Sequence, residues 1–127
     1  MFLKLFGGCR RPLPQSTFRF CHNYDMGIIG YVRFSVETAF EVDAAAADAV
    51  RGRFKSSDGI YVAARKVVDA ALASLAQSRQ ESKTKLDAPC TDAEYTQLQA
   101  EVGAGLTKLG LKLTSIEEPW IREKFDI

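Results

Sequence analysis

The sequence has little of the residue types on which catalytic and metal sites are commonly built. It contains one histidine, His22, and three cysteines, Cys9, Cys21 and Cys90. No nucleophile elbow or oxyanion-type glycine turn accompanies the histidine, so no Ser–His–Asp or Cys–His arrangement is indicated. Three cysteines make no even disulfide framework, and their spacing with His22 fits no standard zinc site. We therefore expect reduced thiols, no metal, no cofactor and no catalytic residue.

Charge of one sign and long apolar runs are also scarce. The formal net charge is +1, whereas nucleic-acid binding needs a concentrated excess of Lys and Arg. No apolar run approaches the roughly 20 residues of a membrane-spanning helix. The stretch Gly27–Gly30 lacks the third glycine of a dinucleotide loop. We expect a single domain that binds no nucleic acid, spans no membrane and takes no small-molecule substrate.

Acidic residues are absent from the first 24 positions, which combine large apolar residues with Ser16 and Thr17. The basic residues there are Lys4, Arg10, Arg11 and Arg19. This composition is typical of a mitochondrial targeting segment and predicts a mitochondrial location. The alternative is a basic N-terminal arm that carries no targeting signal and in which Pro12 and Pro14 interrupt any helix.

Helical spacing of apolar residues begins at about Ser35. It predicts a helix over 35–54, a second over 59–82, and a third that begins at the capping box formed by Thr91 and Glu94. The stripes are Val36, Phe40, Ala47, Val50 and Phe54, then Ile60, Ala64, Val67, Ala71 and Leu75, then Tyr95, Leu98, Val102, Leu109 and Leu113. We expect an all-α fold: a small antiparallel three-helix bundle over 35–116, an irregular basic N-terminal arm and tether over 1–34, and a tail over 117–127.

Three glycines interrupt the predicted third helix, namely Gly103, Gly105 and Gly110. Each costs about 1 kcal/mol of helix propensity relative to alanine. Either a neighbouring helix approaches closely at these positions, or the helix bends or ends early.

Apolar residues outside the predicted helices are candidates for contact with a partner. They are Ile28, Ile29 and Tyr31 in the arm, and Pro119 and Trp120 after the third helix. In a free monomer such groups would face water. A local hydrophobic cap over the bundle is an equally good interpretation of Trp120.

The order of several short motifs resembles a known family. Met26–Gly30 is similar to a Thr-Gly-Leu/Ile-Val-Gly-like opening, Asp58–Tyr61 to a turn that starts a second helix, and Leu98–Glu101 with Pro119–Trp120 to the third helix and its end. On these grounds the chain resembles the alpha-subcomplex subunit 5 family of mitochondrial NADH:ubiquinone oxidoreductase, respiratory complex I. The family's Arg after the tyrosine is Val62 here, and its glycine-rich turn before the third helix is Pro89–Thr91.

The resemblance implies a non-catalytic accessory subunit that packs on the matrix arm of complex I, on the matrix side of the inner membrane. Its partners would be other subunits of that oxidoreductase, and binding would contribute to its stability.

Two alternatives have their own support. Tyr31–Ser35 is similar to a Tyr-Ile-Arg-Tyr-Ser stretch in the small epsilon subunit of the mitochondrial ATP synthase stalk. A free-standing helical adaptor, which binds an amphipathic helix in a groove, is the second alternative.

Overall fold

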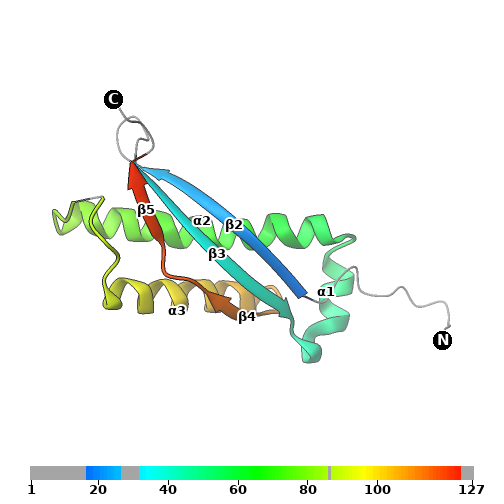
Figure 1. The fold of residues 1–127 in the computed structure, drawn as a ribbon. Helices are drawn as coiled ribbons and strands as arrows, with labels where there is room; N and C mark the ends of the chain where they lie inside the picture. The colour runs from blue at the N-terminus through cyan, green and yellow to red at the C-terminus, as the bar shows by residue number, and fades with distance from the viewer. Residues whose placement is uncertain (1–16, 27–31, 86, 124–127) are drawn as a thin grey trace.

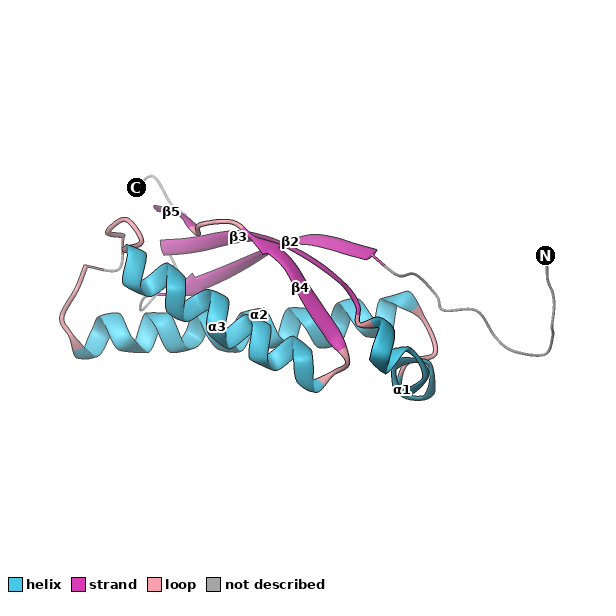
Figure 2. Ribbon diagram, turned by 90° about the horizontal axis from the view of Figure 1, so that it is seen from below, coloured by secondary structure: helices cyan, strands magenta, loops and turns pink. Residues whose placement is uncertain are grey.

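The computed structural model describes residues 17–26, 32–85 and 87–123, which form two layers (Figures 1 and 2). An antiparallel sheet makes one layer, and two long antiparallel helices make the other. In chain order the elements are β2 (Thr17–Met26), β3 (Val32–Val42), the 3-10 helix η1 (Ala44–Ala46), α1 (Ala47–Arg53), α2 (Ser57–Glu81), α3 (Asp92–Lys108), β4 (Leu111–Ile116) and β5 (Trp120–Glu123). The prediction of an all-α three-helix bundle is therefore wrong.

The long strand β3 is the centre of the sheet. It pairs along one side with β2, with Thr17 opposite Glu41 and Asp25 opposite Arg33. Along its other side it pairs first with β5 and then with β4, both antiparallel. The chain thus forms the β2–β3 hairpin first. It then passes through the helices and returns as β4 and β5, which pair with the side of β3 opposite β2.

The predicted first helix is largely a strand because its apolar spacing fits two periods. Val36 and Phe40 are four residues apart, which suits one helix face and one sheet face alike. The even positions from Val32 to Val42 point into the core, and most of the odd ones are polar, such as Arg33 and Glu37. Only Ala47–Arg53 of the predicted segment is α-helical.

The predicted second helix is confirmed as α2, and the predicted start of the third is confirmed as α3. Ser56 caps α2, and Thr91 forms the expected capping box with Glu94. The third helix ends at Lys108, earlier than its apolar stripe suggested. Gly110 adopts φ +83°, a left-handed conformation that ends helices and favours glycine. Leu113 therefore lies in β4 rather than on α3.

The sheet also crosses the predicted domain boundaries. The boundary at 34/35 falls inside β3, and residues 17–26 of the predicted irregular arm form β2. Trp120, in the predicted tail, starts β5 opposite Ser35.

The core lies between the two layers. Phe34, Val36 and Phe40 face it from β3, and Leu72, Leu98 and Leu106 face it from the helices. The Tyr95 hydroxyl donates a hydrogen bond to the carbonyl of Ile116, which connects α3 to the end of β4. Over the described ranges, no helix has both the length and the apolar content needed to cross a membrane.

Candidate functional site

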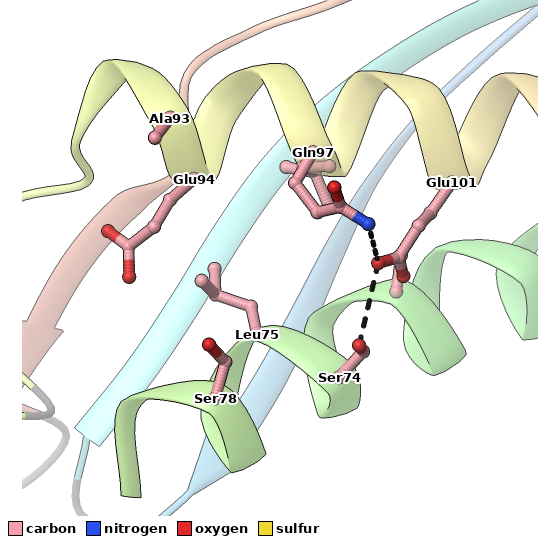
Figure 3. Close-up of a pocket in the computed structure, with 9 residues that line it drawn as sticks. Ser74, Leu75, Ser78, Ala93, Glu94, Gln97 and Glu101 are labelled. Carbon is pink, nitrogen blue, oxygen red and sulfur yellow. Dashed lines mark hydrogen bonds between the residues drawn. The ribbon is translucent and has the colours of Figure 1, made fainter. Parts of the chain in front are cut away.

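A groove runs between α2 and α3, with the sheet behind them in the view of Figure 3. It consists of two adjoining pockets of about 350 and 490 Å³, which share Ala71 and Glu101. We call it the α2–α3 groove. Its polar half is lined by Ala71, Ser74, Leu75, Ser78, Ala93, Glu94, Gln97, Leu98 and Glu101, and its apolar half by Ala63, Lys66, Val67, Ala70, Ala71, Glu101, Gly105, Lys108 and Leu109.

Glu101 organises the middle of the groove. Its carboxylate accepts hydrogen bonds from Gln97 Nε2 at 2.6 Å and from the Ser74 hydroxyl at 3.5 Å (Figure 3). The first bond is within α3, and the second crosses to α2. This network holds polar groups at the surface of the groove, where a partner's hydrogen-bonding groups can reach them.

In the apolar half, α2 and α3 approach closely at a glycine. A Cβ atom added at Gly105 would lie 2.6 Å from Cγ1 of Val67. The close approach that was one interpretation of the helix-interior glycines is thus found at Gly105, and the early end at Gly110. Lys66 and Lys108 flank this half of the groove. The result is an apolar surface with positive charge at its border.

At the other end of the helix pair, Arg79 closes the α2–α3 connection. Its side chain is only 1% exposed, yet it is charged. Nε and Nη2 donate to the two carboxylate oxygens of Glu94, each at 2.8 Å. The guanidinium also donates to backbone carbonyls of the connecting loop and lies 5.4 Å from the ring centroid of Phe34. Those carbonyls belong to Lys85, Ala88 and Pro89.

These contacts shift the titration of two neighbouring groups. The hydrogen bond from Arg79, followed by the amide and hydroxyl of Thr91, lowers the pKa of Glu94 despite partial burial. Burial, followed by the negative charge of Glu94, raises the pKa of the Cys90 thiol to about 11. A thiol with such a pKa is almost wholly protonated near neutral pH and is a poor nucleophile. The arrangement stabilises a loop and a helix end, and it provides no activated group.

The only histidine links the sheet to α2. His22 Nε2 lies 3.0 Å from Asp69 Oδ1, and one turn earlier Arg65 packs over the ring of Phe20 at 5.8 Å. Within 17–26, 32–85 and 87–123 no third carboxylate or thiol joins this pair as a metal site, and no other three His, Cys, Asp or Glu side chains are grouped to hold a metal ion. His22 therefore holds β2 against the helix.

Two of the five predicted partner contacts, Pro119 and Trp120, lie within the described residues. Trp120 is 64% exposed, and it lies on the outer face of the sheet because its neighbour Ile121 pairs with inward-facing Phe34. Pro119 is buried. Ile28, Ile29 and Tyr31 lie outside the described residues. The α2–α3 groove was not predicted, although two small residues seven positions apart on α2, Ala63 and Ala70, and the small Gly105 on α3 were a signal for a close helix pair.

No protein-family model, curated protein or solved structure matches this chain.

Proposed function

We propose that this chain acts by docking, as a small non-catalytic subunit of a larger mitochondrial assembly, and that the α2–α3 groove receives a helix of a neighbouring subunit. The observation that carries the proposal is the apolar half of the groove, an open space of about 490 Å³ over Val67 and Gly105. Recognition of a helix by such a groove uses apolar side chains at helical spacing.

The charges at the groove select the partner. Lys66 and Lys108 border the apolar half, so the fitting helix carries acidic side chains at that end and an apolar stripe in the middle. At the other half, Glu101 and Ser74 favour hydrogen-bond donors. Complementary charge of this kind sets orientation and association rate more than affinity.

Two ionic contacts of the described chain have a structural explanation. Arg79 and Glu94 fasten the α2–α3 connection, and Arg33 with Asp25 bridges β3 and β2 at 2.7 Å. These contacts account for the lowered pKa of Glu94 and the raised pKa of Arg33 without a reaction, and burial is the first cause of the raised pKa of Cys90. Perturbed titration at a structural ion pair is a known alternative to a catalytic site.

The candidate assembly is complex I, and its support comes from the sequence. The acid-free start favours mitochondria. The resemblance in Asp58–Tyr61, Leu98–Glu101 and Pro119–Trp120 favours the complex I subunit family. The helix that this resemblance implies over 35–54 is replaced by β3 and α1, so the likeness is carried by the second half of the chain.

The test is migration of the tagged full chain from mitochondria on a native gel. Co-migration with NADH dehydrogenase activity supports complex I, whereas co-migration with ATPase activity assigns the chain to ATP synthase instead. A chain found only as free monomer would contradict membership of either complex.

A pair of matched variants tests the groove separately. Ala70→Arg places a long charged side chain at the groove, and we expect it to abolish co-migration. Ala104→Arg makes the same change at an exposed α3 position that does not line the groove, and it should migrate as wild type. Equal far-UV circular dichroism of the two variants controls for folding. Co-migration of Ala70→Arg at the wild-type level would show that the partner binds elsewhere.

A further inference from the structure

The two edges of the sheet are built differently. On the β4–β5 side, a register shift at Ala39/Phe40 and the segment Glu117–Pro119 divide the edge into two short strands. Bulges, prolines and charges are the usual devices that stop an edge from pairing with another strand. On the opposite side, β2 runs for ten residues in the register of β3 without a shift. Among the described segments, none pairs with its outer side.

The sequence of β2 is self-complementary when read antiparallel about His22. In that register Arg19 of one copy is opposite Asp25 of the other, and Phe20 is opposite Tyr24. In this register each residue lies opposite one that is an even number of positions away in the sequence. Side chains alternate between the two faces along a strand, so outward residues lie opposite outward residues and inward residues opposite inward ones. Opposite charges and aromatic pairs directly across an antiparallel pair are both favourable.

We propose that β2 pairs antiparallel with β2 of a second copy of this chain, centred on His22, so that the two sheets become one continuous sheet.

Charges on the outer face support this register over its neighbours. Arg33 binds Asp25 at 2.7 Å within one copy, and Arg19 lies 3.9 Å from Glu37. Pairing about His22 joins these two ion pairs into a row of alternating sign, in the order Arg33, Asp25, Arg19 and Glu37. A shift by two residues places Arg19 opposite Asn23 or opposite position 27, and the row is lost. Arg19 is 63% exposed in the single chain, so its side chain is accessible for this contact.

The inward side chains of β2 are already held in place within a single chain. Phe20 packs edge-on against Phe40 and Tyr61, and His22 is held by Asp69. The inward side chains of β2 are therefore ordered before a second copy arrives, which reduces the entropy lost on association. The two-fold axis of such a pair is perpendicular to the sheet, so both α2–α3 grooves lie on the same side of the joined sheet.

A charge-swap pair of full-length variants tests the proposal. In its own dimer, Arg19→Glu places two carboxylates opposite each other, and Asp25→Lys places an ammonium group opposite a guanidinium. Each variant alone should dimerise at least about tenfold more weakly than wild type, because like charges directly across a strand pair repel. When the two variants are mixed they should dimerise with each other, since both contacts then join opposite charges. Sedimentation velocity measures the dimerisation of wild type, of each variant alone and of the mixture, and thermal melting of each variant controls for folding.

Dimers in wild type and in the mixture, with monomers in the separate variants, support the pairing. A monomeric wild type throughout the micromolar range, or variants that stay dimeric alone, would overturn it. If Asp25→Lys does not fold because its new positive charge faces Arg33, the pairing is tested by disulfide formation across the strand pair alone.

Cysteine chemistry fixes the register. In a Cys9→Ser, Cys90→Ser background, exposed Cys21 is opposite Asn23 of the second copy and diagonal to its Cys21. A chain with Cys21 mixed with one carrying Cys21→Ser and Asn23→Cys should form a disulfide between unlike copies faster than between like ones, since directly opposed positions are closer than the roughly 7–8 Å of diagonal ones. Lys112→Cys with Cys21→Ser, on the interrupted edge, is the control and should not cross-link. Cross-linking dominated by like Cys21 copies, or by the Lys112→Cys control, would contradict pairing about His22.

Discussion

At one end of the α2–α3 pair, Arg79 and Glu94 bridge the helices with charge-assisted hydrogen bonds. At the other end, Gly105 lets Val67 approach so closely that a single Cβ atom would not fit. The first end is a buried polar contact, which is specific because each donor has a defined acceptor. The second is a steric contact, which leaves an apolar groove at the surface. The same helix pair is thus fixed by charge at its loop and by close packing at its open end, where the proposed binding groove lies.

Removal of the carboxylate at the polar end should have the largest effect on stability. Glu94→Ala leaves the guanidinium of Arg79 buried without its counter-ion, and we expect a loss of about 3–5 kcal/mol in the free energy of unfolding. Thr91→Ala is the matched control, because it removes the helix cap but keeps the ion pair, and should cost about 1 kcal/mol. Urea denaturation of both variants measures the difference. Equal losses would mean that the cap, and not the ion pair, stabilises this end.

Acid should weaken the polar end and leave the steric end unchanged. The pKa of Glu94 is lower in the folded chain than in the unfolded chain. Its contribution is therefore complete above the unfolded pKa and is lost as the pH falls through the folded pKa. We expect the stability difference between wild type and Glu94→Gln to shrink towards zero over that acidic range. A difference that stays constant from neutral pH to about pH 2 would contradict this role for the carboxylate.

A smaller effect is expected at the steric end, and two glycines of one helix separate its causes. Gly105→Ala gains helix propensity but overpacks against Val67, and should destabilise by about 1–2 kcal/mol. Gly103→Ala meets only Leu113 at 3.9 Å and should stabilise by about 0.5–1 kcal/mol. Thermal melting of the two variants, with Val67→Ala added to Gly105→Ala as a rescue, measures the close contact. If both alanines stabilise equally, the helices have room to separate at Gly105.

The last prediction involves no change in stability. Because burial and the nearby Glu94 raise the pKa of Cys90 to about 11, roughly one thiol in a thousand is ionised at pH 8. In a Cys9→Ser background, iodoacetamide should label the exposed Cys21 well before Cys90, as measured by peptide mass spectrometry. The rate at which iodoacetamide labels Cys90 should keep rising as the pH is raised to about 11. Labelling of Cys90 at the same rate as Cys21 would contradict a protonated, shielded thiol at the polar end.

Local patterns in the sequence were sufficient to predict some elements and not others. The capping box of Thr91 and Glu94 involves residues three apart, so its start signal for α3 needed no tertiary information. The sequence also indicated β3, through the alternation of apolar and polar residues from Val32 to Val42. It was misinterpreted because a spacing of four at Val36 and Phe40 satisfies both periods, and the alanines that follow favour a helix.

The long amphipathic α2 and the cap of α3 follow from the amino-acid sequence alone, because each depends on neighbours within a few residues. The glycines of α3 left open whether that helix bends, ends early or packs closely on a neighbour, and the structure ends it at Lys108. The meeting of Arg79 with Glu94, the approach of Val67 to Gly105, and the sharing of one side of β3 by β4 and β5 depend on the tertiary structure. These contacts join residues 15 or more positions apart, and local propensity carries no information on which distant partner a side chain will meet. The α2–α3 groove and the position of β2 at one edge of the described sheet belong to this second class, since both are defined by the packing of whole elements.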